Sequence, residues 1–157
     1  MVRDFTNIKM GNEKFKLKFE LVPDSCWYSN LRSILSKKEW DYIRHDAYDR
    51  ANGKCMICNR KVSRLEAHEV WQYDEKTCTQ ILVDVVAVCN SCHQVIHIGR
   101  TSLTGNMERA EDWYMKVNNC SYAKMKEELG KATADHQRRN KVSEWKLDLS
   151  FLERYIK

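Results

Sequence analysis

The hydrophobic and polar positions of this chain follow two periods, and a strand-like period of two comes first. Phe15, Leu17 and Phe19 alternate with charged residues, which predicts a strand within residues 1–20. The Val22-Pro23-Asp24 stretch is a turn signal and ends that strand.

A second strand pattern lies in the middle of the chain. Residues 65–71 and 81–88 are rich in β-branched and aromatic side chains, and the stretch 72–80 between them is polar. Two such segments around a polar loop are typical of a β-hairpin.

Helical periodicity precedes this hairpin. Ser36 and Glu39 form a capping-box pattern, so we expect a helix to begin at Ser36 and to end at Asn52-Gly53. Its apolar residues share one helical face: Trp40, Ile43, Ala47 and Tyr48. We expect this helix to brace the segment that follows it.

After residue 100 the composition favours helices again, over residues 106–117 and 122–139. Each helix has one apolar stripe that predicts core packing, Met107, Ala110, Tyr114 and Val117 in the first and Tyr122, Met125 and Leu129 in the second. The tail 144–157 is too apolar for a disordered segment, so we expect it to pack on the domain.

At 157 residues the chain has the size of one domain. We expect residues 1–35 to form a strand and an aromatic-rich segment, 36–100 a functional core with its preceding helix, and 101–157 a helical extension packed on that core. A formal charge of +5 suits a polyanionic partner. The sequence has neither a long apolar run nor a secretory signal at its start, so we expect a cytoplasmic protein without a membrane span.

Four cysteines form two Cys-x-x-Cys pairs, Cys55 with Cys58 and Cys89 with Cys92. Each short knuckle presents both sulfurs to the same side, and four thiolates complete a tetrahedral shell for zinc. A disulfide framework would need an oxidising compartment. The spacing therefore predicts a structural zinc site with no open position for a substrate.

Two histidines follow the second cysteine pair on a predicted helix. We expect that helix to begin with Asn90 as its N-cap and to run to Gly99. His93 and His97 are four residues apart, so their imidazoles lie on one face of it. His68 on the first hairpin strand can face them, which predicts a three-histidine metal site with room for water.

The block Val88-Cys89-Asn90-Ser91-Cys92-His93, followed by His97, resembles the end of the motif of the HNH endonucleases. The preceding Cys55 and Cys58 are similar to the zinc-bearing branch of that family. The flanks look like small bacterial and phage HNH proteins, in residues 68–74 and 145–150. The resemblance implies an α+β fold with a ββα-metal, treble-clef-like core, a four-cysteine zinc knuckle and additional flanking helices.

The sequence departs from the family pattern at two places. Asp84 stands where the family has an asparagine that enters the second strand. On the first strand many members carry a metal ligand followed by a histidine base, and this pair is either Ala67-His68 or His68-Glu69. In the first register His68 is the base, whereas in the second His68 binds the metal and Glu69 takes the base position. We prefer the second, and because adjacent strand residues face opposite ways we expect His68 to face the metal.

The resemblance implies a metal-dependent endonuclease that hydrolyses phosphodiester bonds in DNA by nicking or double-strand cleavage, with RNA as another possible substrate. Its host would be a bacterial or phage-infected cell. His68, His93 and His97 would hold a divalent cation, Mg²⁺, Mn²⁺, Ni²⁺ or Zn²⁺. The residues expected to contact nucleic acid are basic: Arg100, Arg138, Arg139 and Lys141. The last three also suit a helix C-terminus without any ligand.

A second hypothesis is a zinc-binding module that binds nucleic acid or a protein partner and has lost catalysis. Asp84 and the unsettled base favour it. The three histidines in ligand positions favour the enzyme, because a scaffold would not need them.

Overall fold

The structure is a computed structural model that describes residues 16–155. Its fold is mixed α+β, with a small sheet in the order β1-β2-β3. The strands are β1 (Glu66–Asp74), β2 (Thr79–Val88) and β3 (Lys146–Asp148). β1 and β2 form an antiparallel hairpin, and β3 pairs with β2 in parallel.

The helices precede and follow this hairpin in the chain. They are α1 (Leu31–Ile34), α2 (Lys37–Ala51), α3 (Asn90–Ile96), α4 (Ile98–Thr101), α5 (Met107–Asn118) and α6 (Tyr122–Arg139). Two short 3-10 helices, η2 (Asp24–Cys26) and η3 (Ser150–Arg154), complete the described elements. Within residues 16–155, no helix combines the length and the apolar character needed to cross a membrane.

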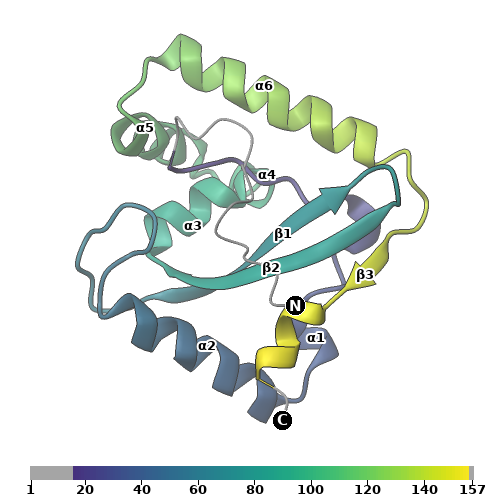
Figure 1. The fold of residues 1–157 in the computed structure, drawn as a ribbon. Helices are drawn as coiled ribbons and strands as arrows, with labels where there is room; N and C mark the ends of the chain where they lie inside the picture. The colour runs from purple at the N-terminus through teal and green to yellow at the C-terminus, as the bar shows by residue number, and fades with distance from the viewer. Residues whose placement is uncertain (1–15, 156–157) are drawn as a thin grey trace.

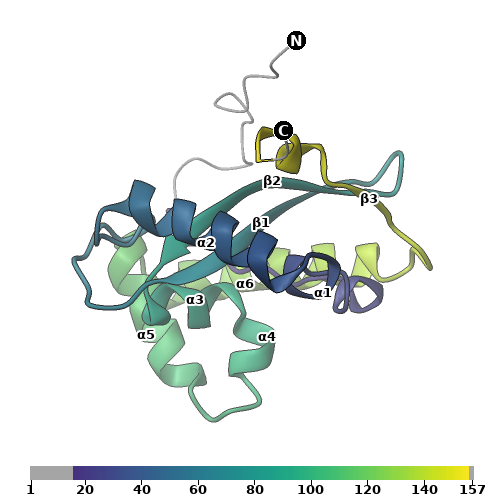
Figure 2. The ribbon, with the colours of Figure 1, turned by 90° about the horizontal axis from the view of Figure 1, so that it is seen from below.

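The sheet separates two layers of helices, as Figures 1 and 2 show. On one face α1, α2 and η3 bury an apolar cluster that includes Leu31, Ile43 and Phe151. On the other face α3 to α6 bury a second cluster with Val95, Tyr114 and Met125. The hairpin strands therefore have one face toward each layer, and the direction of a strand side chain decides which layer it reaches.

Helix α2 follows the sequence prediction closely. Ser36 is its N-cap, and its side chain and that of Glu39 form the reciprocal capping box. Asn52 ends the helix in the left-handed conformation at φ 51°, and Gly53 follows at φ 78°, a backbone region that glycine adopts without strain. Helix α2 packs mainly against β2, and its end is tied to the loop of the first cysteine knuckle by the Lys54 N–H, which donates to the Ala51 carbonyl at 3.1 Å.

The hairpin is longer than the sequence predicted. Both strands extend into the polar stretch 72–80, so the connection shrinks to residues 75–78. Tyr73 pairs with Gln80 across the strands, and Gln80 Nε2 donates a hydrogen bond to the Tyr73 hydroxyl at 3.2 Å. This bond lets the polar Gln80 side chain be buried inside the sheet.

The predicted N-terminal strand is wrong for the part that the structure describes, and Phe15 lies outside it. Residues 16–23 have no strand assignment, although Leu17 and Phe19 are buried as the alternation predicted. The segment lies against helices instead of a neighbouring strand: the Leu17 backbone exchanges two hydrogen bonds with the Asn118 side chain, at 3.0 Å each. Alternating burial therefore arises here without a β-partner.

The C-terminal predictions are largely confirmed. Helix α6 has the predicted bounds, Met125 is fully buried, and the tail packs on the sheet through β3, Phe151 and Leu152. Tyr122 was expected in the core but is exposed, because it stands at the first turn of α6, where its ring lies near Lys126 at 5.4 Å.

Candidate metal centres

The four cysteines of the two knuckles converge on one point. Cys55 and Cys58 come from the loop after α2, and Cys89 and Cys92 stand at the start of α3. All four sulfurs lie within 4.8 Å of one another, and the Cys58 and Cys89 sulfurs are 3.8 Å apart. Zinc–sulfur bonds of about 2.3 Å give a tetrahedron with an edge of about 3.8 Å. The cluster therefore has the dimensions of a four-thiolate zinc site.

Local backbone geometry shapes the first knuckle. Asn59 adopts the left-handed conformation at φ 62°, and its N–H donates to the Cys55 carbonyl at 2.9 Å. The Met56 N–H donates to the Ala87 carbonyl, also at 2.9 Å, which fixes the knuckle to β2. These bonds turn both sulfurs toward α3.

The second knuckle begins α3 one residue earlier than predicted. Cys89, and not Asn90, is the N-cap, and its sulfur accepts a hydrogen bond from the Cys92 N–H at 3.5 Å. Trp113 of α5 donates from Nε1 to the Cys92 sulfur at 3.3 Å. The sulfurs thus already act as hydrogen-bond acceptors, as metal-bound thiolates do.

Without a cation, the clustered cysteines change one another's pKa values through hydrogen bonds and burial. A hydrogen bond from Cys92 lowers the pKa of Cys55 to about 4, and the same contact raises the pKa of Cys92. Burial raises the pKa of Cys58. A divalent cation would replace these protons and neutralise the thiolates, so the donor set fits structural zinc.

The second cluster consists of His68 from β1 with His93 and His97 from α3 and its end. One ring nitrogen of each lies within 4.8 Å of the others. Their ring centroids are 5.4, 5.2 and 4.7 Å apart. Three imidazoles that bind one ion at about 2.1 Å would have centroids separated by about 4.5–5.3 Å. The sequence correctly predicted that these residues come together, and they could hold a metal ion.

His97 stands at a break in the predicted helix. Helix α3 ends at Ile96, and His97 at φ −92° and ψ 49° connects it to α4, so the predicted continuous helix to Gly99 is wrong. The His97 N–H still donates to the His93 carbonyl at 3.1 Å. This last helical bond preserves the one-turn spacing of the two imidazoles.

The environment keeps two of these histidines neutral. Burial lowers the pKa of His93 and lowers that of His97 to about 3, and the neighbouring His68 and Arg100 act in the same direction. A neutral imidazole has the free lone pair that a metal requires. The site is therefore ready for a cation at neutral pH.

Two carboxylates that the sequence analysis did not select contact the histidines. The Glu66 carboxylate lies 3.5 Å from His93 Nδ1 and accepts a hydrogen bond from Asn90 at 3.2 Å. The Glu20 carboxylate lies 2.8 Å from His68 Nε2. Glu66 is two residues from His68 on one strand, so strand periodicity could have identified it. No local pattern could have identified Glu20, which precedes the motif by a long stretch of chain.

Glu69 and Asp84 do not join the cluster. Glu69 points to the opposite face of the sheet, where its carboxylate accepts from the Leu31 N–H at 2.7 Å and from Trp71 Nε1 at 3.2 Å. Strand alternation places His68 on one face and Glu69 on the other. Asp84 accepts from the Val85 N–H at 2.8 Å and lies 3.7 Å from the Arg50 guanidinium. Neither carboxylate faces the histidines.

The basic residues expected at nucleic acid lie in two places. Arg100 on α4 is close enough to act on the pKa values of His93 and His97. Arg138 at the end of α6 donates two hydrogen bonds to Glu75 at the hairpin turn, at 2.6 and 2.8 Å, and Arg139 packs on the Tyr73 ring. Lys141 is exposed just beyond them.

The Glu75 end of the hairpin is remote from the histidines. Asp74 lies six positions after His68 on β1, which corresponds to about 20 Å at 3.3 Å per residue. Helix α6 crosses to that end of the hairpin in Figure 1. The structure therefore brings Arg100 to the histidine cluster and leaves Arg138, Arg139 and Lys141 far from it.

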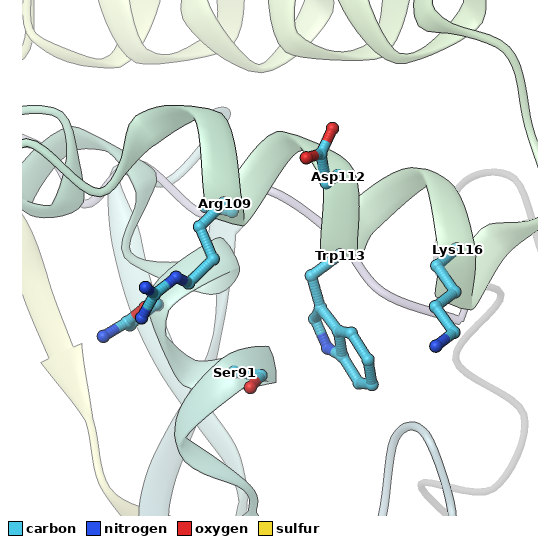
Figure 3. A pocket seen from close by; sticks show the side chains of 7 residues that line it. Ser91, Arg109, Asp112, Trp113 and Lys116 are labelled. Carbon is cyan, nitrogen blue, oxygen red and sulfur yellow. The ribbon is translucent and has the colours of Figure 1, made fainter.

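A small open pocket of about 210 Å³ lies between α3 and α5. Figure 3 shows Arg109, Trp113 and Lys116 of α5 around it, with Ser91 of α3 opposite. Ser91 is on α3 and His97 directly follows the last residue of that helix, six residues later, or about 9 Å along the helix axis. The exposed side chains of Arg109 and Lys116 therefore lie beside α3, the helix that carries His93.

Comparison with family models, with curated proteins and with solved structures finds no match for this chain. The two clusters and the surfaces around them are therefore the basis for assigning a function.

Proposed function

We propose that this protein is a metal-dependent endonuclease of the HNH type that hydrolyses phosphodiester bonds in DNA. The observation that carries the proposal is the convergence of His68, His93 and His97 beside a four-cysteine cluster. The order β1, β2, α3, with cysteines before β1 and at the start of α3, supports a ββα-metal core. DNA is the expected substrate, with RNA as the alternative outcome of the same assay.

In this proposal the two clusters have separate roles. The cysteines hold structural zinc and fix the start of α3 to the knuckle, and no coordination position is left for a substrate. The histidines hold a divalent cation, for which neutral imidazoles favour Zn²⁺, Ni²⁺ or Mn²⁺ over Mg²⁺. When bound, that cation would neutralise the scissile phosphate and the leaving oxygen.

The general base must be a residue whose side chain faces the histidine site. Because Glu69 is bonded on the other face of the sheet, it is not proposed as the base. His68 keeps both of its possible roles, as a third ligand or as the base, and the ligand role is preferred because its ring lies in the cluster with His93 and His97. If the His68→Ala protein kept its full content of the divalent cation held by the histidines, His68 would be the base instead.

The phosphate contacts are proposed near α3. Arg100 on α4 and the exposed Arg109 and Lys116 on α5 lie on the histidine-bearing side of the sheet. They could bind the DNA backbone on both sides of the scissile bond, because phosphate contacts position the duplex without reading its sequence. Arg138 does not have this role, since Glu75 neutralises it.

The test is plasmid cleavage by purified protein with a panel of divalent ions. We expect His93→Ala to lose on the order of 100-fold or more in cleavage rate, because removing one ligand weakens the cation that all three hold. The control is His45→Ala, which changes an exposed histidine on α2. Cleavage by the His93→Ala protein at the wild-type rate would refute the proposal.

The same variant separates the enzyme from the second candidate. The absence of Glu69 from the histidine site is the observation that favours a binding module without catalysis. Such a module would bind DNA with unchanged affinity after His93→Ala and would show no cleavage in any metal, whereas the proposed nuclease loses cleavage and keeps its fold.

A further inference from the structure

The segment before α1 places the Glu20 carboxylate at the histidine cluster. This segment lies outside the unit of β1, β2 and α3 that carries the histidines. The Glu20 N–H donates to the Ile96 carbonyl at 2.9 Å, at the last residue of α3. One residue earlier, the Phe19 ring stacks on Tyr114 with centroids 4.3 Å apart. Leu17 is fixed by its two bonds to Asn118. The backbone of Glu20 is therefore held in place by α3 and α5.

Leu21, the residue after Glu20, shows how closely this segment approaches α4. A Cβ added to Gly99 would lie 3.1 Å from Leu21 Cδ2, which is tighter than ordinary van der Waals contact. The lack of a side chain at Gly99 thus leaves room for Leu21. The chain on either side of Glu20 can therefore pass close to the histidines.

The Glu20 side chain uses this position to reach His68. Its Oε2 atom lies 2.8 Å from His68 Nε2, and the His68 ring is 4% exposed. A carboxylate oxygen at this distance favours the tautomer in which Nε2 carries the proton and donates it. In that tautomer of the neutral ring, the lone pair is on Nδ1.

The geometry separates this contact from direct metal ligation. Two ligand atoms at about 2.1 Å from one ion lie about 3.0–3.4 Å apart, whereas 2.8 Å is an ordinary distance for a charge-assisted hydrogen bond. Among the residues that the structure describes, the donors that gather within 4.8 Å of one another are the three histidines, without Glu20. Glu20 therefore stands behind His68 and not beside it.

We infer that Glu20 is a positioning residue of the histidine centre, which fixes the tautomer and ring orientation of His68 so that Nδ1 is presented to the cation. The inference rests on the proposed metal site. A carboxylate that accepts a hydrogen bond from a ligand histidine orients the ring and makes its lone pair more basic. The cation site would then include a residue from a segment that the motif does not contain.

The test uses Mn²⁺ alone as the probe, added to full-length protein that carries one equivalent of zinc, because the four thiolates hold that equivalent and do not select Mn²⁺. We expect Glu20→Ala to weaken Mn²⁺ binding by about 10–100-fold. Glu20→Gln should recover most of this loss, because its amide oxygen accepts the same hydrogen bond. Glu108→Ala, which removes an exposed carboxylate of α5, is the matched control. Zinc content and circular dichroism check the fold of each variant.

A second readout does not depend on the metal. Nitrogen NMR of the His68 ring in Mn²⁺-free protein should show the proton on Nε2 in the wild type and a mixture of tautomers in Glu20→Ala. Unchanged Mn²⁺ affinity or an unchanged tautomer in Glu20→Ala would overturn the inference, and an equal loss in Glu20→Gln and Glu20→Ala would identify a direct ligand instead. If wild-type protein neither bound Mn²⁺ nor cleaved DNA, the proposed function would fail, while the tautomer measurement would still test Glu20.

Discussion

Arg138 at the end of α6 and Glu75 at the hairpin turn are joined by two hydrogen bonds of 2.6 and 2.8 Å. The pair ties the far end of the hairpin to the helix that crosses it. It also means that the most basic stretch of the sequence is not a free phosphate-binding surface, because a carboxylate already occupies its fork.

This arrangement predicts which cations contribute to DNA affinity. Arg109→Gln and Lys116→Gln should each weaken binding without sequence preference and reduce the slope of log K against log salt by about 1. Arg138→Gln should leave both quantities unchanged. Fluorescence anisotropy over a salt series measures them, and a larger effect of Arg138→Gln would return the interface to the end of α6.

The cysteine cluster should determine whether the central region folds. Structural zinc contributes an apparent 10–16 kcal/mol in small domains, roughly the whole stability of a typical one at about 5–15 kcal/mol. Cys58→Ser should therefore lose zinc and unfold residues around the knuckle. Elemental analysis and thermal melting check this, with Cys78→Ser as control because Cys78 lies at the hairpin turn. Zinc-free wild-type protein with an unchanged melting temperature would contradict the prediction.

Glu69 should matter for stability and not for cleavage. Burial raises the pKa of its carboxyl, and its two oxygens accept from Leu31 and Trp71. Glu69→Ala leaves these donors without a partner and should cost about 1–3 kcal/mol. Glu69→Gln, which keeps an acceptor, should cleave plasmid at nearly the wild-type rate. A large loss of cleavage in a fully folded Glu69→Gln protein would restore Glu69 as the base.

The protein without a cation at its histidines should lose stability in acid. The folded pKa of His97 is about 3 against an ordinary 6.5, so between these values the unfolded chain binds more protons than the folded one. Its contribution is present above about pH 6.5 and is lost progressively as the pH falls toward 3. Melting temperatures measured from neutral pH to about pH 4 should fall less steeply for His97→Asn. Parallel curves for the two proteins would show that His97 does not titrate in this way.

Residues that signal through neighbours in sequence could be predicted. The capping box at Ser36 and the left-handed stop at Asn52 gave α2 its bounds, because both ends of a helix are decided by side chains within one turn. Cys-x-x-Cys pairs and the four-residue spacing of His93 and His97 likewise predicted which side chains meet. The opposite faces of His68 and Glu69 follow from strand alternation alone.

Contacts between distant segments could not be predicted. The sequence shows Glu20 as one charge in an alternating stretch, and only the packing of Phe19 on Tyr114 and of Leu21 near Gly99 brings it to His68. The pairing of Arg138 with Glu75 depends on where α6 ends relative to the hairpin. After the break at His97, α4 packs against α5, and the sequence around the break contains no proline that would predict it.

Cys92 and His93 are neighbours in α3, and β1 with His68 lies in the loop of chain that the two knuckles close. Joining Cys58 to Cys89 therefore brings β1 back to α3, and with it His68 to His93. The four cysteines therefore hold both ends of the chain segment that carries His68. Under the proposed function, loss of zinc from the cysteines would therefore also loosen the histidine centre, although the two clusters share no ligand.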